Sequence, residues 1–323
     1  MTVTTDVRTH RHGAEPSSRT TGHRKRRPWT ARDKRQLKLG LLFVSPWLVG
    51  VTVFVLYPLV YSIVISLMRY SGMHTPEYVG LGNYVAIFLD PLARISVSNT
   101  LFYAGLAVPL GLVVALILAL AMNQNVREVA FYRTALYVPS LVPAFAMAFI
   151  FIVFVNPQFG LFNRFLAVFG GQNVDLLADP TTAKLVIVLI AQLGAGNAAL
   201  IYLAGLRNIP TTLYESARVD GASRWRQFWS ITVPLLSPVI LFNLITGISG
   251  ALQIFTEAFI MTDGGPDNGT LFYMLYLYRN AFSYAQLGFA SAMAVLLFLA
   301  GMLLASLVFY LSRRFVHYDA AAG

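Results

Sequence analysis

Residues 214–222 read Tyr-Glu-Ser-Ala-Arg-Val-Asp-Gly-Ala, and the segment runs on through Ile231 and Pro234 to Leu235. It is a polar and charged island between two long apolar segments. A membrane protein rarely keeps so structured a segment as a mere connection. The island is therefore the first candidate for a functional element.

The rest of the chain has the composition of a membrane protein. It is 57% hydrophobic and 12% charged, with a mean hydropathy of +0.63, well outside the soluble norm. A bilayer core of about 30 Å needs about 20 apolar residues per helix, and backbone exposed to lipid must be helical. Six stretches are long enough, at about 40–66, 98–122, 136–156, 184–206, 233–255 and 287–311. Composition predicts an all-α polytopic membrane protein, with kinks at Pro58, Pro109 and Pro139–Pro143.

The distribution of basic residues predicts the orientation. Of the 24 Lys and Arg, all but five lie in residues 1–39, 123–135, 207–232 and 313–314. The other five are Arg69, Arg94, Arg164, Lys184 and Arg279. Because cytoplasmic loops carry the excess of Lys and Arg, both termini and the polar island are expected in the cytoplasm.

The same charges bear on domains and partners. Residues 1–38 are rich in Arg, Thr, Ser and His, and we expect a disordered cytoplasmic tail that could touch anionic membrane lipid. Residues 39–314 are predicted to form one permease domain, and 315–323 a cytoplasmic C-terminal tail. A net charge of +10 would suggest nucleic acid for a soluble protein, but here it fixes topology, so no nucleic-acid partner is expected.

The sequence lacks the residues that several kinds of catalytic and binding site require. The chain has no cysteine, and its five histidines lie in tails or a loop without metal-ligand spacing. None of its four lysines follows a glycine, so the phosphate-binding Gly-Lys pattern is missing. We therefore expect no catalytic residue, metal or cofactor in this chain, and energy must come from a partner.

The polar island is predicted to form two short helices. Thr212 as N-cap and Glu215 three residues later fit a capping box. Gly221 lies where a helix would end in a left-handed turn, and Ser223 can cap a second helix over Arg224–Ser230. Three aromatic side chains would share one face of that helix: Trp225, Phe228 and Trp229. On these residues alone, Glu215 can simply cap its own helix.

A family resemblance adds a second role for the island. Its spacing is Glu-x-Ala, three residues, Gly, nine residues, Ile-x-x-Pro. This resembles the signature loop of permease subunits of binding-protein-dependent ABC importers, of the carbohydrate-uptake, maltose-permease-like kind. Other matching segments occur in family order at 80–84, 131–134, 159–163 and 264–266. The sequence departs from the family at Ser216, where Ala is most common, and at Val233, where Leu is usual.

The resemblance implies the ABC type I importer permease fold, with six transmembrane helices and a cytoplasmic coupling-helix loop. Helix 212–220 would lie in a cleft of an ATPase, with Glu215 paired to a basic group there. The implied coupling residues are Glu215, Ser216, Ala217, Asp220, Gly221, Ala222, Ile231 and Pro234. The implied partners are a second homologous permease in a heterodimer, two ATP-binding subunits that hold ATP-Mg, and an extracellular sugar-binding protein, all at a bacterial plasma membrane.

Polar groups inside the predicted membrane helices are candidates for the substrate pathway, because such groups are costly in lipid. The set is Gln192, Asn197, Asn243, Gln253, Phe255 and Glu257. Neutral amides and an aromatic face suit a sugar, which has hydroxyls around an apolar ring. The alternative is that the amides join helices to one another. Glu257 could also be a gate, a contact for the binding protein or a solvated charge.

Two other functions stay open at this point. An importer permease for an anionic solute such as glycerol phosphate would favour basic groups in the pathway. Lys184 is the only basic residue within a predicted span, and it lies at an end. An ion-coupled secondary transporter would need a carboxylate in mid-membrane, and none of the six stretches holds one centrally.

Overall fold

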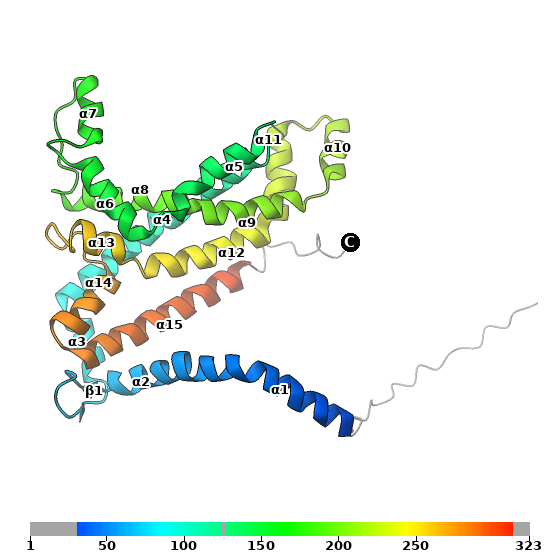
Figure 1. Ribbon diagram of the computed structural model, residues 1–323. Helices are drawn as coiled ribbons and strands as arrows, with labels where there is room; N and C mark the ends of the chain where they lie inside the picture. The colour runs from blue at the N-terminus through cyan, green and yellow to red at the C-terminus, as the bar shows by residue number, and fades with distance from the viewer. Residues whose placement is uncertain (1–30, 125–126, 313–323) are drawn as a thin grey trace, which may run out of the picture. The chain divides into compact units, whose positions relative to one another are not determined.

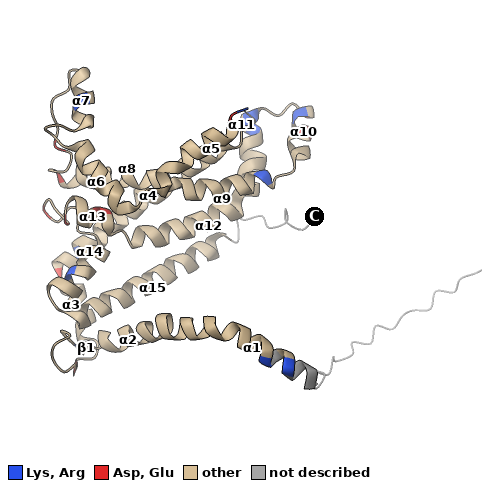
Figure 2. Cartoon of the chain, in the orientation of Figure 1, with Lys and Arg blue, Asp and Glu red and all other residues tan. Residues whose placement is uncertain are grey.

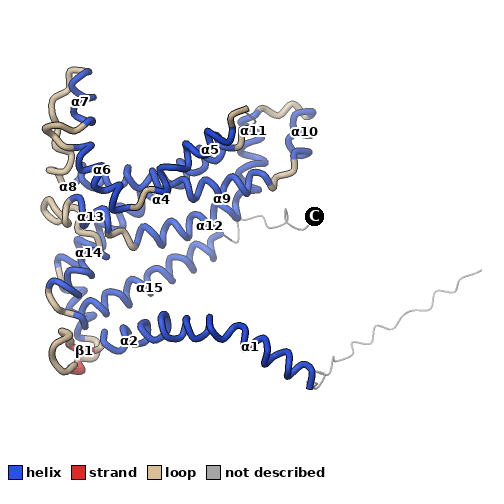
Figure 3. Tube along the Cα trace, in the orientation of Figure 1, coloured by secondary structure: helices blue, strands red, loops and turns tan. Residues whose placement is uncertain are grey.

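The structure is a computed structural model that describes residues 31–124 and 127–312. Its described part is mainly helical, with connecting loops and one pair of short strands (Figure 3). The chain divides into two compact units, residues 1–57 and 58–323. The first contains α1 (Ala31–Val51) and a π-helical turn (Thr52–Leu56). Residues 1–30 of the predicted N-terminal tail, and all of the predicted C-terminal tail, lie outside the described residues.

The second unit holds the remaining elements, after α2 (Tyr57–Ser66) has crossed the boundary. They are β1 (Met68–Arg69), β2 (Glu77–Tyr78), α3 (Gly82–Leu89), α4 (Pro91–Met122), α5 (Val129–Tyr137), α6 (Ala144–Val155), α7 (Leu161–Val168), α8 (Pro180–Ala191), α9 (Gly196–Arg207), α10 (Thr211–Val219), α11 (Arg224–Gln227), α12 (Val233–Leu252), α13 (Thr256–Met261), α14 (Tyr273–Tyr278) and α15 (Leu287–Ser312) (Figure 1). The two strands pair antiparallel, with Met68 opposite Tyr78.

By length and composition, five continuous helical segments in the described residues can cross a membrane. They are Lys38–Ser66, Pro91–Met122, Pro180–Arg207, Arg224–Met261 and Leu287–Ser312. Two shorter helical segments, Val129–Leu141 and Ala144–Val155, meet at a bend of 91°. If they count as one broken span, the number of spans is six. Pro139 and Pro143 flank this bend and cannot donate backbone hydrogen bonds. The expected number of six, and the kink between these prolines, are both found.

Several helices begin earlier than expected. The first starts at Ala31, not near residue 39. The fifth runs from α11 through a π-helical turn (Phe228–Thr232) into α12, so its first residue is Arg224. The prediction that Arg224–Ser230 forms a separate short helix was therefore wrong. Pro234 has no backbone N–H to donate, which explains the π-helical turn that ends two residues before it. Pro58 likewise stands two residues after the end of a π-helical turn. Pro109, in contrast, lies inside an uninterrupted α4.

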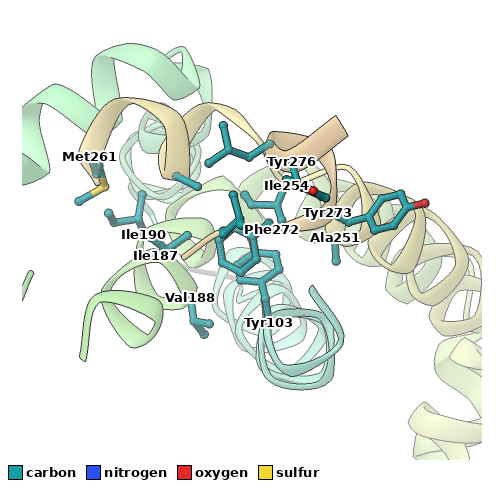
Figure 4. Packing of buried hydrophobic residues seen from close by; sticks show 14 of the residues in the cluster. Tyr103, Ile187, Val188, Ile190, Ala251, Ile254, Met261, Phe272, Tyr273 and Tyr276 are labelled. Atoms are coloured by element: carbon teal, nitrogen blue, oxygen red, sulfur yellow. The ribbon is translucent and has the colours of Figure 1, made fainter. Parts of the chain in front are cut away.

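The largest buried cluster joins α4, α8 and the segment from the end of α12 to α14 (Figure 4). Phe272 is completely buried, and its ring centroid is 5.4 Å from that of Tyr103. A second cluster joins α4, α9 and the start of α12. A Cβ at Gly205 would lie 2.9 Å from side-chain atoms of Leu236 and Val239, so the glycine lets α9 and α12 approach closely.

The turn between α13 and α14, at Asp263–Asn268, is held on several sides. Asp263, Asp267 and Asn268 have positive φ. The Arg279 guanidinium pairs with Asp263 Oδ1 at 2.9 Å. Asn99 Nδ2 of α4 donates to Asn268 O at 2.8 Å. The turn is thus tied to both α14 and α4.

Candidate coupling and substrate sites

The helix formed by the polar island, α10, stands away from the protein interior. None of its residues is buried, and Val219 is 89% exposed. Lys and Arg gather on α10 and α11 at one end of this unit (Figure 2). Among the described residues, one side-chain hydrogen bond joins α10 to the rest, between Tyr214 Oη and Thr232 Oγ1 at 2.9 Å, and Tyr214 also packs on the second core cluster. Exposed apolar groups on a helix with so little support indicate a surface that another protein covers.

The predicted capping box is wrong. The helix begins at Thr211, one residue early, with Pro210 in the N-cap position and no side-chain cap bond. Pro210 has φ −60°, the ring-fixed value that leads directly into a helix, so no Thr212 cap is needed. Glu215 then lies more than a turn inside α10, is exposed, and makes no ion pair with the described residues. Its carboxylate is free for a partner.

The end of α10 follows the prediction. Gly221 has φ +75°, and the N–H groups of Gly221 and Ala222 donate to Arg218 O (3.0 Å) and Ala217 O (2.8 Å). These two bonds make a Schellman motif. Ser223 caps the next helix, since its Oγ accepts from Arg226 N at 3.3 Å. The turn angle therefore comes from backbone geometry.

The other implied coupling residues lie around this turn. Ser216 is exposed and donates to Thr212 O of its own helix at 2.9 Å, Ala217 is half-buried, and Asp220 is the exposed C-cap. Ile231 and Pro234 are half-buried beneath the turn, where Ile231 packs on the second core cluster. The aromatic face of the next helix forms as expected, with centroid distances of 5.1–6.0 Å among Trp225, Phe228 and Trp229.

Two of the six predicted pathway residues line one cavity of about 190 Å³ between α4, the α8–α9 region and α12. They are Gln192 and Asn243. The other lining residues are Tyr103, Ala107, Val108, Gly111, Leu112, Ala191, Gly194, Ala195, Ala198, Gly247, Gly250 and Ala251. All of these described residues are uncharged, so the cavity suits a neutral ligand.

Gln192 leaves a hydrogen-bond acceptor unused. Its Nε2 donates to Val188 O of its own helix at 2.6 Å. Its buried Oε1 has no partner among the described residues. A buried unpaired oxygen is unfavourable, so it needs a donor from a ligand or water. Asn243 likewise donates to its own helix, to Val239 O at 3.1 Å. Neither amide shows the helix-to-helix bond that the alternative interpretation requires.

The remaining four predicted residues lie outside this cavity. Asn197 Oδ1 accepts from Tyr137 Oη at 3.3 Å, which joins α9 to α5. Gln253 is exposed at the end of α12, and Phe255 packs among aromatic rings. Glu257 is half-buried in the first turn of α13.

The contribution of α4 to the cavity was missed in the sequence. Tyr103 and Gly111 both line it. A Cβ at Gly111 would lie 3.3 Å from Gln192 Oε1, so the glycine leaves room for that oxygen. The sequence did contain a signal for this contact, because the small residues of α4 at 104–111 mark a place where another helix can approach closely.

Polar side chains also form an exposed face on α12, which we call the polar stripe: Thr246, Ser249 and Gln253. Their three- and four-residue spacing places them on one side of the helix. Each bonds to a carbonyl of its own helix at 2.9–3.1 Å. Because polar groups are costly against lipid, this face borders water or another protein chain.

Comparison with known proteins decides the family. A family model described as binding-protein-dependent transport system inner membrane component matches residues 107–317. The chain belongs to this family. The permease is 36% identical over 285 residues to the probable ABC transporter permease protein YesP of Bacillus subtilis, covering 87% of the chain and 92% of YesP. It is 35% identical over 282 residues to the lactose transport system permease protein LacF of Rhizobium radiobacter, covering 85% and 94%.

A solved structure supports the fold of the permease. The crystal structure of a bacterial alginate ABC transporter, in complex with an alginate pentasaccharide-bound periplasmic protein, contains a chain that matches with a TM-score of 0.78. The match is 23% identical in sequence and covers 88% of the permease and 96% of that chain. The predicted type I importer permease fold is confirmed.

Membership settles the broad function. The permease is a transport subunit rather than an enzyme, and it is a multi-pass protein of the plasma membrane. Family members work with a binding protein and with ATPase partners. The alternative of an ion-coupled secondary transporter was wrong.

Proposed function

We propose that this permease carries a neutral saccharide, an oligosaccharide in particular, released by an extracellular binding protein. The observation that carries the proposal is the uncharged cavity with the unpaired Gln192 Oε1. Sugar hydroxyls are hydrogen-bond donors that would satisfy this acceptor. The name of the similar LacF, a lactose transport permease, supports a sugar.

The polar stripe and the cavity together supply a pathway of the same chemistry. Both lie on α12 and offer hydroxyls and amides without fixed charge. An anionic solute such as glycerol phosphate would need a cation in the pathway. Lys184 is instead half-buried beside α4, where its Nζ donates to Asn99 Oδ1 at 3.2 Å and lies 5.0 Å from the Phe102 ring centroid. The anionic alternative is therefore disfavoured.

In this proposal, the ATPase partners drive transport by moving α10. Two ATP-binding subunits hold ATP-Mg on the cytoplasmic side, where both termini and α10 lie, and one of them receives α10 in a cleft. A second permease, homologous but different, completes the pore. Closure of the ATPases moves α10, and the Schellman turn passes this movement to the continuous helix from Arg224 to Leu252.

Substitution of Gln192 tests the sugar pathway. A thermal-shift screen of the binding protein identifies its sugar, and uptake of that sugar is measured with the reconstituted complex. Gln192→Leu should raise the KM about two- to tenfold, the loss of one hydrogen bond. Its melting temperature should not fall, because an apolar group replaces an unpaired buried oxygen.

The matched control is Gln124→Leu. Gln124 is exposed and also bonds its own helix, to Leu120 O at 3.2 Å, but it does not line the cavity. Equal KM values for both variants would argue against the cavity as the pathway. Uptake of glycerol 3-phosphate in place of any sugar would refute the proposal that the transported solute is a saccharide.

A further inference from the structure

An aromatic array lies beyond the end of the polar stripe, formed by Phe255, Phe259, Tyr278 and Phe282. Phe255 stacks on Phe259 with centroids 5.3 Å apart and planes at 12°. Tyr278 lies 5.0 Å from Phe255, 5.6 Å from Phe259 and 5.0 Å from Phe282. The rings therefore form a continuous series, and its free end is open because Phe282 is 72% exposed.

The array is held in place by its supports. Phe259 belongs to α13, and Tyr278 ends α14, so two elements must keep their spacing. The pair between Arg279 and Asp263 links the α14 end to the turn after α13. Thr262 and Thr270 join the two sides of that turn through their hydroxyls at 2.6 Å. Rings on such a frame are preorganised to stack on the face of a ligand ring.

The array also continues the pathway. Ser249 and Gln253 of the polar stripe line an open hollow of about 550 Å³ together with Met274 and Leu277 of α14. The same helix carries Tyr278 at its end. Gln253 of the polar stripe is also only two residues from Phe255 of the array, so the two surfaces adjoin along the chain.

We propose that the aromatic array is a stacking subsite for saccharide rings at the outer end of the permease, before the cavity. The proposal rests on the proposed function. A sugar ring has a face of C–H groups with slight positive charge, which is attracted to the negative face of an aromatic ring. The open rings of Phe282 and Phe259 would take the first sugar residue, and its hydroxyls would then reach Gln253.

The test uses the complete complex with its binding protein and ATPase in nanodiscs, and measures uptake of lactose, maltotriose and arabinotriose. Phe282→Ala and Phe259→Ala should each raise the KM for the transported saccharide about two- to tenfold, as expected for one aromatic contact. Phe282→Tyr, which keeps the ring, should restore it. Phe88→Ala is the control, since Phe88 is 69% exposed on α3 and belongs to none of the ring pairs that form the array.

The outcomes separate the two proposals. Saccharide uptake with an unchanged KM in both alanine variants overturns the stacking subsite and leaves the proposed function standing. Failure to transport any saccharide overturns both. If Phe282→Ala instead releases the second permease during size-exclusion chromatography, the array is a subunit interface and the stacking subsite is overturned.

Discussion

At the scale of single residues, Gly221 is where conformation and function are most directly joined. Its φ of +75° allows the Schellman turn after α10, yet a Cβ built there meets no atom within 4 Å. A side chain at this position would therefore have room, and glycine is favoured there only because of the positive φ of the backbone. A β-branched residue would pay about 1–2 kcal/mol in this left-handed region, whereas asparagine adopts it more easily.

This difference predicts the behaviour of two variants. Gly221→Val should open the turn, misdirect α10 and reduce ATP-driven uptake strongly, while the protein remains in the membrane. Gly221→Asn should keep most of the uptake because the turn survives. Uptake and membrane abundance of both are to be measured side by side. Similar losses in the two variants would show that side-chain size, not φ, is what matters.

The accuracy of prediction also varied residue by residue. Gly221 and Ser223 were predictable because their roles follow from local backbone chemistry. The helix start was predicted wrongly, because Pro210 acts through its ring and displaced the expected Thr212 cap. Gln192 was selected for its polarity, but its partner glycine on α4 was not, since a contact between distant helices leaves no local pattern.

At the scale of elements, a partly buried hydrogen bond joins α14 to the start of α4. The Tyr276 hydroxyl donates to Asp90 Oδ2, and Asp90 also caps α4 by accepting from Leu92 N at 2.9 Å. The helix α14 lies outside the membrane-spanning segments. Burial first, and then the bond to Asp90, raise the pKa of Tyr276 to about 12 from its ordinary value of 10.0.

The raised pKa of Tyr276 predicts a loss of stability at alkaline pH. The folded protein favours the neutral phenol, so its contribution is complete below pH 10 and is lost as the pH rises toward 12. Tyr276→Phe should lower the melting temperature by about 2–4 °C at pH 8, for a loss of about 1 kcal/mol. The difference from the native protein should shrink between pH 10 and 12.

The control is Tyr78→Phe, because Tyr78 is 75% exposed on β2. Its melting temperature should follow that of the native protein at every pH. A Tyr276→Phe variant that does the same would show that the bond to Asp90 adds nothing to stability.

The elements themselves were largely predictable, because length and hydropathy decide whether a segment can span a bilayer. The boundaries were not, since helices extend into polar sequence once their first turns are paired. Thus the fifth helix starts at Arg224, well inside the polar island. The bend of 91° in the third span depends on how Pro139 and Pro143 pack, which proline positions alone do not specify.

At the scale of the whole molecule, the proposed function requires that a movement at α10 reaches the cavity. The proposed saccharide pathway lies along α12, and the same helix runs without interruption back to Arg224, next to the Schellman turn. A movement of α10 therefore reaches the cavity through one rigid element. In the described part of the chain, α10 has a single side-chain bond to its support, between Tyr214 and Thr232, and its charged residues are exposed, as such a role requires.

The free carboxylate of Glu215 supplies the final prediction. Because no described residue pairs with it, its charge is available to a basic group of the ATPase. Glu215→Lys should place like charges together and abolish both uptake and the stimulation of ATP hydrolysis, with normal membrane insertion. Glu215→Gln, which keeps the shape without the charge, should retain part of both activities, and Ser216→Ala should be close to native. Uptake and ATP hydrolysis are measured on the same reconstituted complex, because a lost pairing must reduce the two together. Full activity of Glu215→Lys would mean that α10 docks through its exposed apolar residues alone.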